Sequence, residues 1–292
     1  MKKVKIVTDS NSGILQSEAE DLGIYVIPMP FTVNNEEYLE EISMSQDEFY
    51  KHLEADADVK TSQPSQYYLE NLWNDLLKDY DELLYIPMCS GLSATCANAR
   101  RYAESFDGKV FVVDNLRISV TQRESVMEAI ELAKKGKSAS DIKKYLEDTK
   151  QKASIYITIG TYKYLKKGGR INPAVATIGS MLNVKPILYT RGDKFNKYAM
   201  TMSLSQAKKK MIAKIKEELE TEFKDEYEKG KMYLSIAHTQ NEEEAIKFKE
   251  EVLKAIPNAK FHYIAPLSLS VSCHIGPGAL ALAMAVNNYC ND

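Results

Sequence analysis

Four short polar segments contain the residue types that could hold a small acidic molecule. Each is expected at the start of a helix, and the four are residues 8–12 (TDSNS), 61–65 (TSQPS), 90–93 (SGLS) and 274–278 (HIGPG). Backbone N–H groups are unpaired at a helix N-terminus, and together with the helix dipole they favour an anion. The hydroxyls and the imidazole could therefore hold a carboxylate without an arginine, and glycine would let the backbone N–H groups approach it closely.

Helix capping is the ordinary explanation of such segments. Ser, Thr and Asn are preferred N-cap residues because their side chains accept a hydrogen bond from the first turn. For any one segment taken alone, capping explains the residues better than ligand binding. The segment containing His274 and Gly276 is less easily explained, since histidine is not a preferred cap, although a single histidine is more often structural than functional.

A hydrolase is the main enzymatic alternative. Ser93, His274 and Asp114 could meet in space as a catalytic triad, although nothing in their spacing singles them out. The chain contains none of the glycine-rich phosphate or dinucleotide motifs and no G-x-S-x-G elbow. It also has no H-E-x-x-H motif or Cys/His cluster. These missing motifs predict no metal site and no cofactor, and they leave the hydrolase open.

Composition narrows the partners and the compartment. The 292 residues carry 38 Lys and Arg against 41 Asp and Glu, a net charge of −3, so no nucleic acid partner is expected. No apolar run approaches the ~20 residues of a membrane span, and the first residues lack a signal-peptide pattern, which predicts a cytoplasmic protein. Free, buried thiols are expected at Cys89, Cys96, Cys273 and Cys290, because their spacing fits no zinc site.

Strands and helices alternate along the first half of the chain. Apolar, β-branched runs predict strands at residues 3–7, 23–29, 83–87 and 110–113. Helices are predicted at residues 45–53, 64–78, 93–105, 119–135 and 138–150, the first with a capping box of Ser45 and Glu48. This alternation predicts an α/β fold with a mostly parallel sheet and helices on both faces. Ligands of such sheets bind beyond the carboxyl ends of the strands.

The second half is predicted to form a separate α/β domain. Strands are expected at residues 154–159, 184–189, 194–198, 232–237 and 259–264. Helices are expected at residues 172–182, 204–222, 241–253, with Asn241 as N-cap, and 277–287. A lysine-rich stretch at residues 143–152 suggests the boundary, which gives domains of residues 1–152 and 153–292.

A basic turn, residues 164–171 (YLKKGGRI), follows the strand predicted at residues 154–159. Two interpretations stay open. One is an exposed loop with ordinary charges, and the other is a docking point for an acidic partner or a phosphate group.

Taken in order, the motifs form a pattern that resembles the DegV family of bacterial fatty-acid-binding proteins. They are TDSNSG at the N-terminus, TSQPS at residues 61–65, SGLSAT at 90–95, YLKKGGRI at 164–171, KPIL at 185–188 and HIGPGALALA at 274–283. Each motif is weak alone, but the ordered set is specific and spans essentially the whole chain.

The resemblance implies a two-domain lipid carrier without turnover of its own. One long-chain fatty acid would lie in a tunnel between and within the domains. A separate fatty-acid kinase would phosphorylate its carboxylate for phospholipid synthesis, with Arg170 touching that partner, and the carrier could contact a membrane transiently. By motif position, the ligand contacts would be Thr61, Ser62, Gly91, Ser93, His274 and Gly276.

Burial of the acyl chain would supply most of the affinity, since each CH₂ contributes ~0.8 kcal/mol and sixteen carbons on the order of 10 kcal/mol. A tunnel in the usual ~300–1,000 Å³ range would hold it. Plain core packing is the better explanation for most of the candidate lining residues; these are Ile27, Met29, Phe31, Ile159, Ile178, Leu182 and Ile187.

Several positions depart from the family pattern. Ala94 replaces a glycine, Cys96 stands where an aromatic residue is common, and residues 121–123 (TQR) replace a Gly-Gln-Gly. Residues 199–205 contain no arginine where the family commonly has Arg-x-Arg. A third hypothesis follows, in which the carrier has changed to another amphipathic acid or lost its kinase.

Overall fold

The computed structural model describes residues 2–161, 163–165, 169–172 and 184–290. Its first half is built on a parallel four-stranded sheet in the order β2-β1-β6-β7, as the alternating pattern predicted. The strands are β1 (Val4–Asp9), β2 (Tyr25–Ile27), β6 (Glu82–Ile86) and β7 (Val110–Val112).

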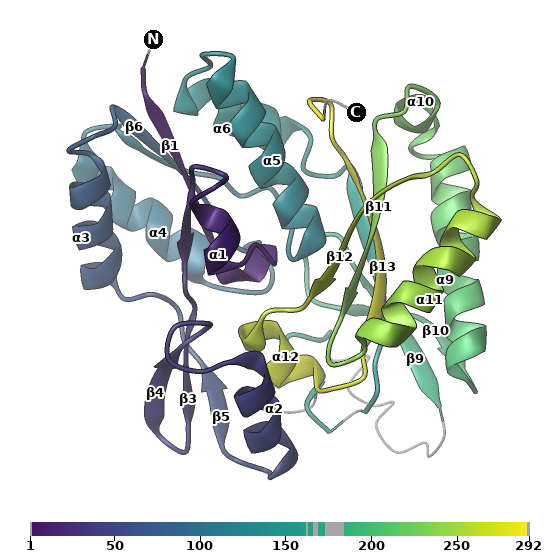
Figure 1. The fold of residues 1–292 in the computed structure, drawn as a ribbon. Coiled ribbons are helices and arrows are strands. Elements are labelled where there is room, and N and C mark those ends of the chain that lie inside the picture. The colour runs from purple at the N-terminus through teal and green to yellow at the C-terminus, as the bar shows by residue number, and fades with distance from the viewer. Residues whose placement is uncertain (1, 162, 166–168, 173–183, 291–292) are drawn as a thin grey trace.

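Helices cover both faces of this sheet because alternate strand residues point to opposite sides (Figure 1). Val7 and Tyr85 pack with α3 (Gln66–Leu76) and α4 (Thr95–Ala103). Ile6 and Leu84 pack on the other face with the remaining helices. Those helices are α1 (Gln16–Ala19), α5 (Val120–Lys134) and α6 (Ala139–Asp148), and short 3-10 turns lie at Ser10–Ser12 and Glu104–Phe106.

A small antiparallel sheet, ordered β4-β3-β5, was not predicted. It comprises β3 (Pro30–Val33), β4 (Glu36–Leu39) and β5 (Val59–Thr61), and it packs with α2 (Gln46–Glu54). The β3–β4 turn consists of Asn34 and Asn35, with φ of 52° and 69°. Two consecutive positive φ values are what a two-residue hairpin turn requires, and asparagine tolerates them.

The second half contains a six-stranded mixed sheet in the order β10-β9-β8-β13-β11-β12. β11 and β12 pair in parallel, and the other neighbouring strands are antiparallel. The strands are β8 (Ala153–Thr158), β9 (Lys185–Thr190), β10 (Asn196–Thr201), β11 (Met232–His238), β12 (Lys260–Pro266) and β13 (Leu280–Val286).

One face of the six-stranded sheet is covered by helices and the other faces the first half of the chain. Met211 and Phe248 pack against the outer face from α9 (Leu204–Glu220) and α11 (Glu242–Ala255), with α10 (Lys224–Glu228) following α9. The inner face contributes Ile155 and Ile157 to a core shared with Val120 of α5 and with α12 (Leu269–Ile275). The division at residues 152 and 153 stays a prediction.

The helix predicted at residues 277–287 is wrong, because residues 280–286 form the central strand β13. Its alanines Ala281 and Ala283 face the inner core, whereas Leu280 and Leu282 face the outer one. A strand that is buried on both faces has a continuous apolar run instead of an alternating one. The alanines in residues 280–286 have a high helix propensity, so this run resembles a buried helix. His274 therefore lies in the last turn of α12, not at the start of a helix.

Two capping predictions have different outcomes. Ser45 caps α2 through a capping box with Glu48, as predicted. Asn241 occupies the N-cap position of α11, but its side chain makes no capping hydrogen bond. The helix predicted at residues 172–182, with Ile178 and Leu182, falls mainly outside the described residues.

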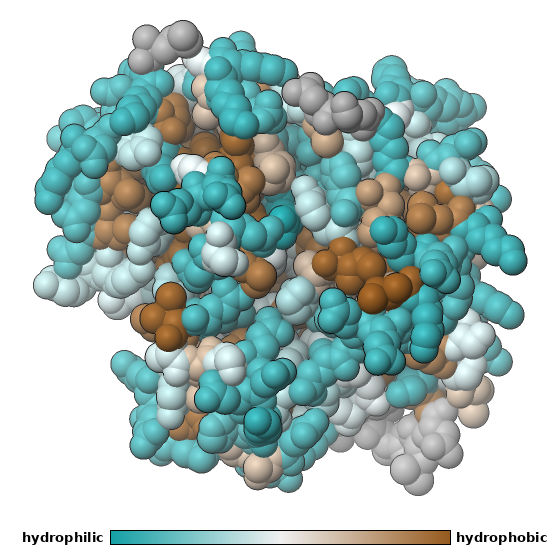
Figure 2. Space-filling view, viewed as in Figure 1, coloured by the Kyte–Doolittle hydropathy of each residue, from teal (hydrophilic) through white to brown (hydrophobic). Residues whose placement is uncertain are grey.

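The surface offers no continuous apolar face in the view of Figure 2, where hydrophobic side chains show in separate patches among hydrophilic ones. Among the described residues, the exposed large hydrophobic side chains are scattered along the chain and are Leu15, Ile42, Tyr67, Met202 and Ile246. Across the part of the chain that the structure covers, no helix combines the length and apolar character needed to cross a membrane.

The Asn34–Asn35 turn yields a test of the unpredicted hairpin. Asn35→Val should lower the free energy of unfolding by about 1–2 kcal/mol, because a β-branched residue resists positive φ. Asn35→Gly is the matched control and should leave the stability unchanged or raise it slightly. Urea denaturation measures both, and equal stability of the two variants would contradict the turn geometry.

Candidate functional site

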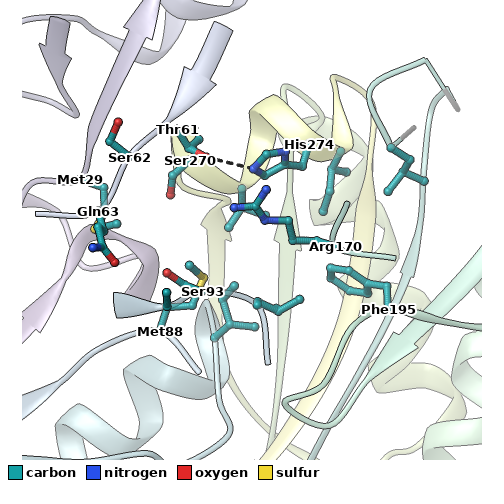
Figure 3. A pocket seen from close by; sticks show the side chains of 16 residues that line it. Met29, Thr61, Ser62, Gln63, Met88, Ser93, Arg170, Phe195, Ser270 and His274 are labelled. Carbon is teal, nitrogen blue, oxygen red and sulfur yellow. Dashed lines mark hydrogen bonds between the residues drawn. The ribbon is translucent and has the colours of Figure 1, made fainter. Parts of the chain in front are cut away.

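A pocket of about 190 Å³ lies where the three sheets approach one another. The segment after β5 contributes Thr61, Ser62 and Gln63, and the segment after β6 contributes Met88 and Ser93. α12 contributes the opposite wall, and Arg170 reaches in from the second half (Figure 3). The pocket thus lies beyond the carboxyl end of β6, where an α/β sheet is expected to bind ligands.

Thr61 and His274 form the polar end of the pocket. Thr61 Oγ1 and His274 Nε2 are hydrogen-bonded at 3.2 Å (Figure 3). Burial, together with the smaller effect of the positive charge of Arg170, lowers the pKa of His274 from 6.5 to about 4. The imidazole is therefore neutral near pH 7, so with Thr61 it presents neutral hydrogen-bonding groups to the pocket.

Arg170 lines this pocket as well as a second, polar cavity of about 190 Å³. The second cavity shares Thr61, Arg170 and His274 with the first and adds Lys60 and Tyr164. Figure 3 shows the guanidinium beside His274, although the sequence analysis placed Arg170 only at a partner surface. Asp56 also lines this cavity, and Lys60 is ion-paired with Asp58 at 2.7 Å, so Arg170 is the cation that both spaces share among the described residues.

Ser93 lines the pocket and also caps a helix. Its Oγ accepts a hydrogen bond from Thr95 N at 3.1 Å and lies 2.8 Å from Thr95 Oγ1. The capping explanation and the pocket position therefore apply to the same hydroxyl. Ser62 also lines the pocket, and its backbone N–H donates to Pro30 O at 3.0 Å, which ties the site to β3.

Gly91 and Gly276 do not line the pocket, although the sequence analysis grouped them with the ligand contacts. A Cβ on Gly91 would lie 2.1 Å from Gly192 O, and one on Gly276 would lie 2.2 Å from the Tyr164 ring. Gly276 also has φ of 78°, a conformation that favours glycine. Both glycines therefore permit close packing around the site.

Ser93, His274 and Asp114 do not form a hydrogen-bonded triad in the described part of the chain. Ser93 pairs with Thr95, and His274 pairs with Thr61. Asp114 Oδ1 accepts from Ser90 N at 3.3 Å. Within the same residues, no group of three or more His, Cys, Asp or Glu side chains could hold a metal ion.

An apolar cavity of about 20 Å³ adjoins the pocket on the core side. It shares Ile118, Phe195, Val271 and Ile275 with the pocket. It extends along the inner face of the six-stranded sheet, with Ile155, Ile157, Ala281 and Ala283 in its wall. The pocket therefore has a polar end at His274 and an apolar end in the core between the two halves.

Core packing, the favoured explanation for most of the candidate apolar lining residues, holds for the described ones that lie outside the pocket. Met29 lines the pocket, whereas Ile27 and Ile187 pack in other core clusters. Ile159 packs in the core cluster that also contains apolar pocket residues, without lining the pocket itself. Phe31 packs in the small-sheet core and borders a different groove. The apolar end was missed because it depends on β13 being a strand: Ala281 and Ala283 share the face of Ile155 and Ile157 only in that geometry.

The first polar segment, residues 8–12, does not line the pocket but holds α12 in place. Ser10 Oγ donates to Glu40 Oε2 at 2.6 Å, and Glu40 Oε1 accepts from Leu269 N at 2.6 Å. Asn11 Oδ1 accepts from Ser268 Oγ at 2.8 Å and from the Ser270 hydroxyl. Through these bonds the end of β1 positions the helix that carries His274.

Comparison with known proteins agrees with this architecture. The family model described as "Uncharacterised protein, DegV family" matches residues 3–287. The chain belongs to the DegV family. A DegV domain-containing protein of Staphylococcus aureus (strain N315) is 31% identical over 288 residues, covering 97% of this chain and 99% of the relative.

Two solved structures share the fold. The crystal structure of DegV, a fatty acid binding protein from Bacillus subtilis, matches with a TM-score of 0.84 and 30% identity, covering 98% of this chain and all of that one. A stearic acid-binding protein from Eubacterium ventriosum matches with a TM-score of 0.86 over 97% of this chain and 98% of its own. Its identity is 21%, so this likeness shows the shared fold alone.

Glu40 yields a test of the link between β1 and α12. Burial raises the pKa of Glu40 from its ordinary 4.5 to about 7, so the folded chain keeps a proton that the unfolded chain releases between these values. The free energy of unfolding should therefore fall as pH rises through this window, by on the order of 3 kcal/mol from this group.

Glu40→Gln removes the titration and is compared with the unaltered chain by urea denaturation at a series of pH values. The difference between the two free energies of unfolding should change across pH 4.5 to 7 in favour of the variant. Parallel stability curves would contradict the buried position of Glu40.

Proposed function

We propose that this chain binds one long-chain fatty acid, with the carboxylate at Thr61 and His274 and the acyl chain directed toward the inner face of the six-stranded sheet. One observation carries the proposal: a pocket that is polar at His274 and Arg170 adjoins an apolar cavity in the core. The fatty-acid binding of the Bacillus subtilis relative supports it.

The charges around the polar end suit an ionised carboxylate. Thr61 and the neutral His274 share one hydrogen bond, so one of their two hydrogens remains available to a carboxylate, and Arg170 supplies the compensating positive charge. Because the imidazole is neutral near pH 7, recognition depends on hydrogen bonding there and on the guanidinium for charge. Ser93 and Ser62 border the same space and add further hydroxyls.

The acyl chain would occupy the pocket and the apolar cavity together. The pocket alone, at about 190 Å³, is smaller than the ~300–1,000 Å³ of typical ligand sites. A long chain therefore has to separate side chains shared by the two spaces, such as Phe195 and Ile275. Its burial supplies ~0.8 kcal/mol per CH₂ against that cost.

We further propose a carrier role, in which a separate fatty-acid kinase reaches the carboxylate through the polar cavity. That cavity adjoins the Thr61–His274 pair, and Arg170 in its lining suits an approaching phosphoryl group. Arg170 would then serve both the ligand and the partner. The absence of arginine from residues 199–205 bears on partner binding more than on lipid binding.

His274 tests the carboxylate end. His274→Ala should weaken fatty-acid binding by about 1–3 kcal/mol, because it removes a buried hydrogen-bonding partner. His274→Gln retains a neutral donor and acceptor and should lose less. Isothermal titration calorimetry with palmitate measures both, and unchanged affinity in His274→Ala would refute the assignment.

Ala283 tests the acyl end. Ala283→Val adds volume to the wall of the apolar cavity, so octadecanoate affinity should fall by about 1–3 kcal/mol, while dodecanoate affinity changes less. Met284→Leu lies on the opposite face of β13 and is the matched control, which should leave both affinities unchanged. Equal losses for the two acids in Ala283→Val would place the acyl chain elsewhere.

A further inference from the structure

A hydrogen-bonded row of cysteine, histidine and glutamate lies away from the pocket. Cys290 Sγ is 3.4 Å from His262 Nε2, and His262 Nδ1 is 2.6 Å from Glu124 Oε1. The three residues come from the segment after β13, from β12 and from α5. In Figure 1 the C-terminal end lies near α5 at the top of the view, whereas α12 lies in the lower half beside α2.

The hydrogen bonds define the role of each imidazole nitrogen. Glu124 is buried, and its carboxylate accepts from His262 and also from Asn287 Nδ2 at 2.9 Å. Since a carboxylate only accepts, Nδ1 of His262 carries the hydrogen, and Nε2 offers its lone pair to the Cys290 thiol. The Tyr233 ring stacks on the imidazole at 3.8 Å between centroids and restricts its rotation.

The other three cysteines have a different environment. Cys89, Cys96 and Cys273 are buried, whereas Cys290 is partly exposed. Burial raises the pKa of each buried thiol to about 12, so they remain protonated near pH 7. Cys290 combines access to solvent with a histidine base that a third residue orients, which is the arrangement of an activated cysteine nucleophile.

We propose that Cys290 is a reactive thiol that reduces small hydroperoxides and is itself converted to a sulfenic acid. His262 takes the thiol proton, and the sulfur attacks one peroxide oxygen. The S–O bond forms as the O–O bond breaks, and the proton on His262 passes to the leaving oxygen to give water or an alcohol. Sulfur loses two electrons and the peroxide gains them, so the step balances without a further reactant.

This site is independent of lipid binding. None of its three side chains lines the pocket or its two adjoining cavities. A failed test of this site would therefore leave the proposed lipid binding unaffected, and the reverse also holds. Glu124 acts only through His262 and is a positioning residue.

The test compares oxidation rates of the four cysteines in the purified full chain at neutral pH. Hydrogen peroxide is added in the presence of dimedone, and peptide mass spectrometry quantifies the adduct at each cysteine. In the folded protein Cys290 should react at least about tenfold faster than the same cysteine in urea-unfolded protein, because an oriented base accelerates proton transfer. A thiol that is merely exposed reacts no faster folded than unfolded, and that result would overturn the proposal.

Two variants separate activation from simple exposure. His262→Gln should bring the rate at Cys290 down to that of the unfolded chain, and Glu124→Gln should lower it partly by loosening the imidazole. Circular dichroism verifies that each variant is folded. If a variant does not fold, the comparison of Cys290 oxidation rates between the folded and the urea-unfolded unaltered chain still decides the proposal. An unaltered rate in folded His262→Gln would also refute the proposal.

Discussion

The buried polar contact between the end of β1 and the start of α12 is the interaction on which the site depends. Glu40 joins Ser10 to the backbone of Leu269, and Asn11 binds Ser268. These groups come from residues far apart in the chain and are buried, so each needs a partner to offset the loss of water. Because those partners lie at the N-terminal end of α12, the helix has a defined position against the small sheet.

That position brings His274 to Thr61 and so creates the polar end of the pocket. The same helix packs Val271 and Ile275 against the inner face of the six-stranded sheet, which creates the apolar end. One short helix therefore separates a hydrogen-bonding region from a hydrophobic one along a single axis. A molecule with a charged head and an apolar tail matches this order, and a uniformly polar molecule does not.

Local patterns in the sequence predicted much of the first half, because β-branched runs and capping residues act over a few positions. The parallel sheet and the Ser45 cap belong to this class. The polar segments containing Thr61 and His274 were also recognised, and the structure brings them together. Which residues these two segments contact depends on the order of the strands in the sheets. The sequence therefore predicted the residues but not the contact between them.

Longer-range features were not predictable in the same way. Residues 280–286 have helix-favouring alanines, and only pairing with β8 and β11 on both sides makes them a strand. The apolar end of the pocket was missed as a consequence. Asn34 and Asn35 form a hairpin turn, but their sequence indicates one only weakly because such turns usually contain glycine. Arg170 was noticed for its charge, but its place beside His274 comes from tertiary packing.

The central claim is that the pocket binds a fatty acid, and denaturing extraction of the purified chain followed by mass spectrometry tests it most directly. The account predicts one long-chain fatty acid released per chain, either as purified or after incubation with a panel of fatty acids. A chain that releases none under both conditions would contradict it.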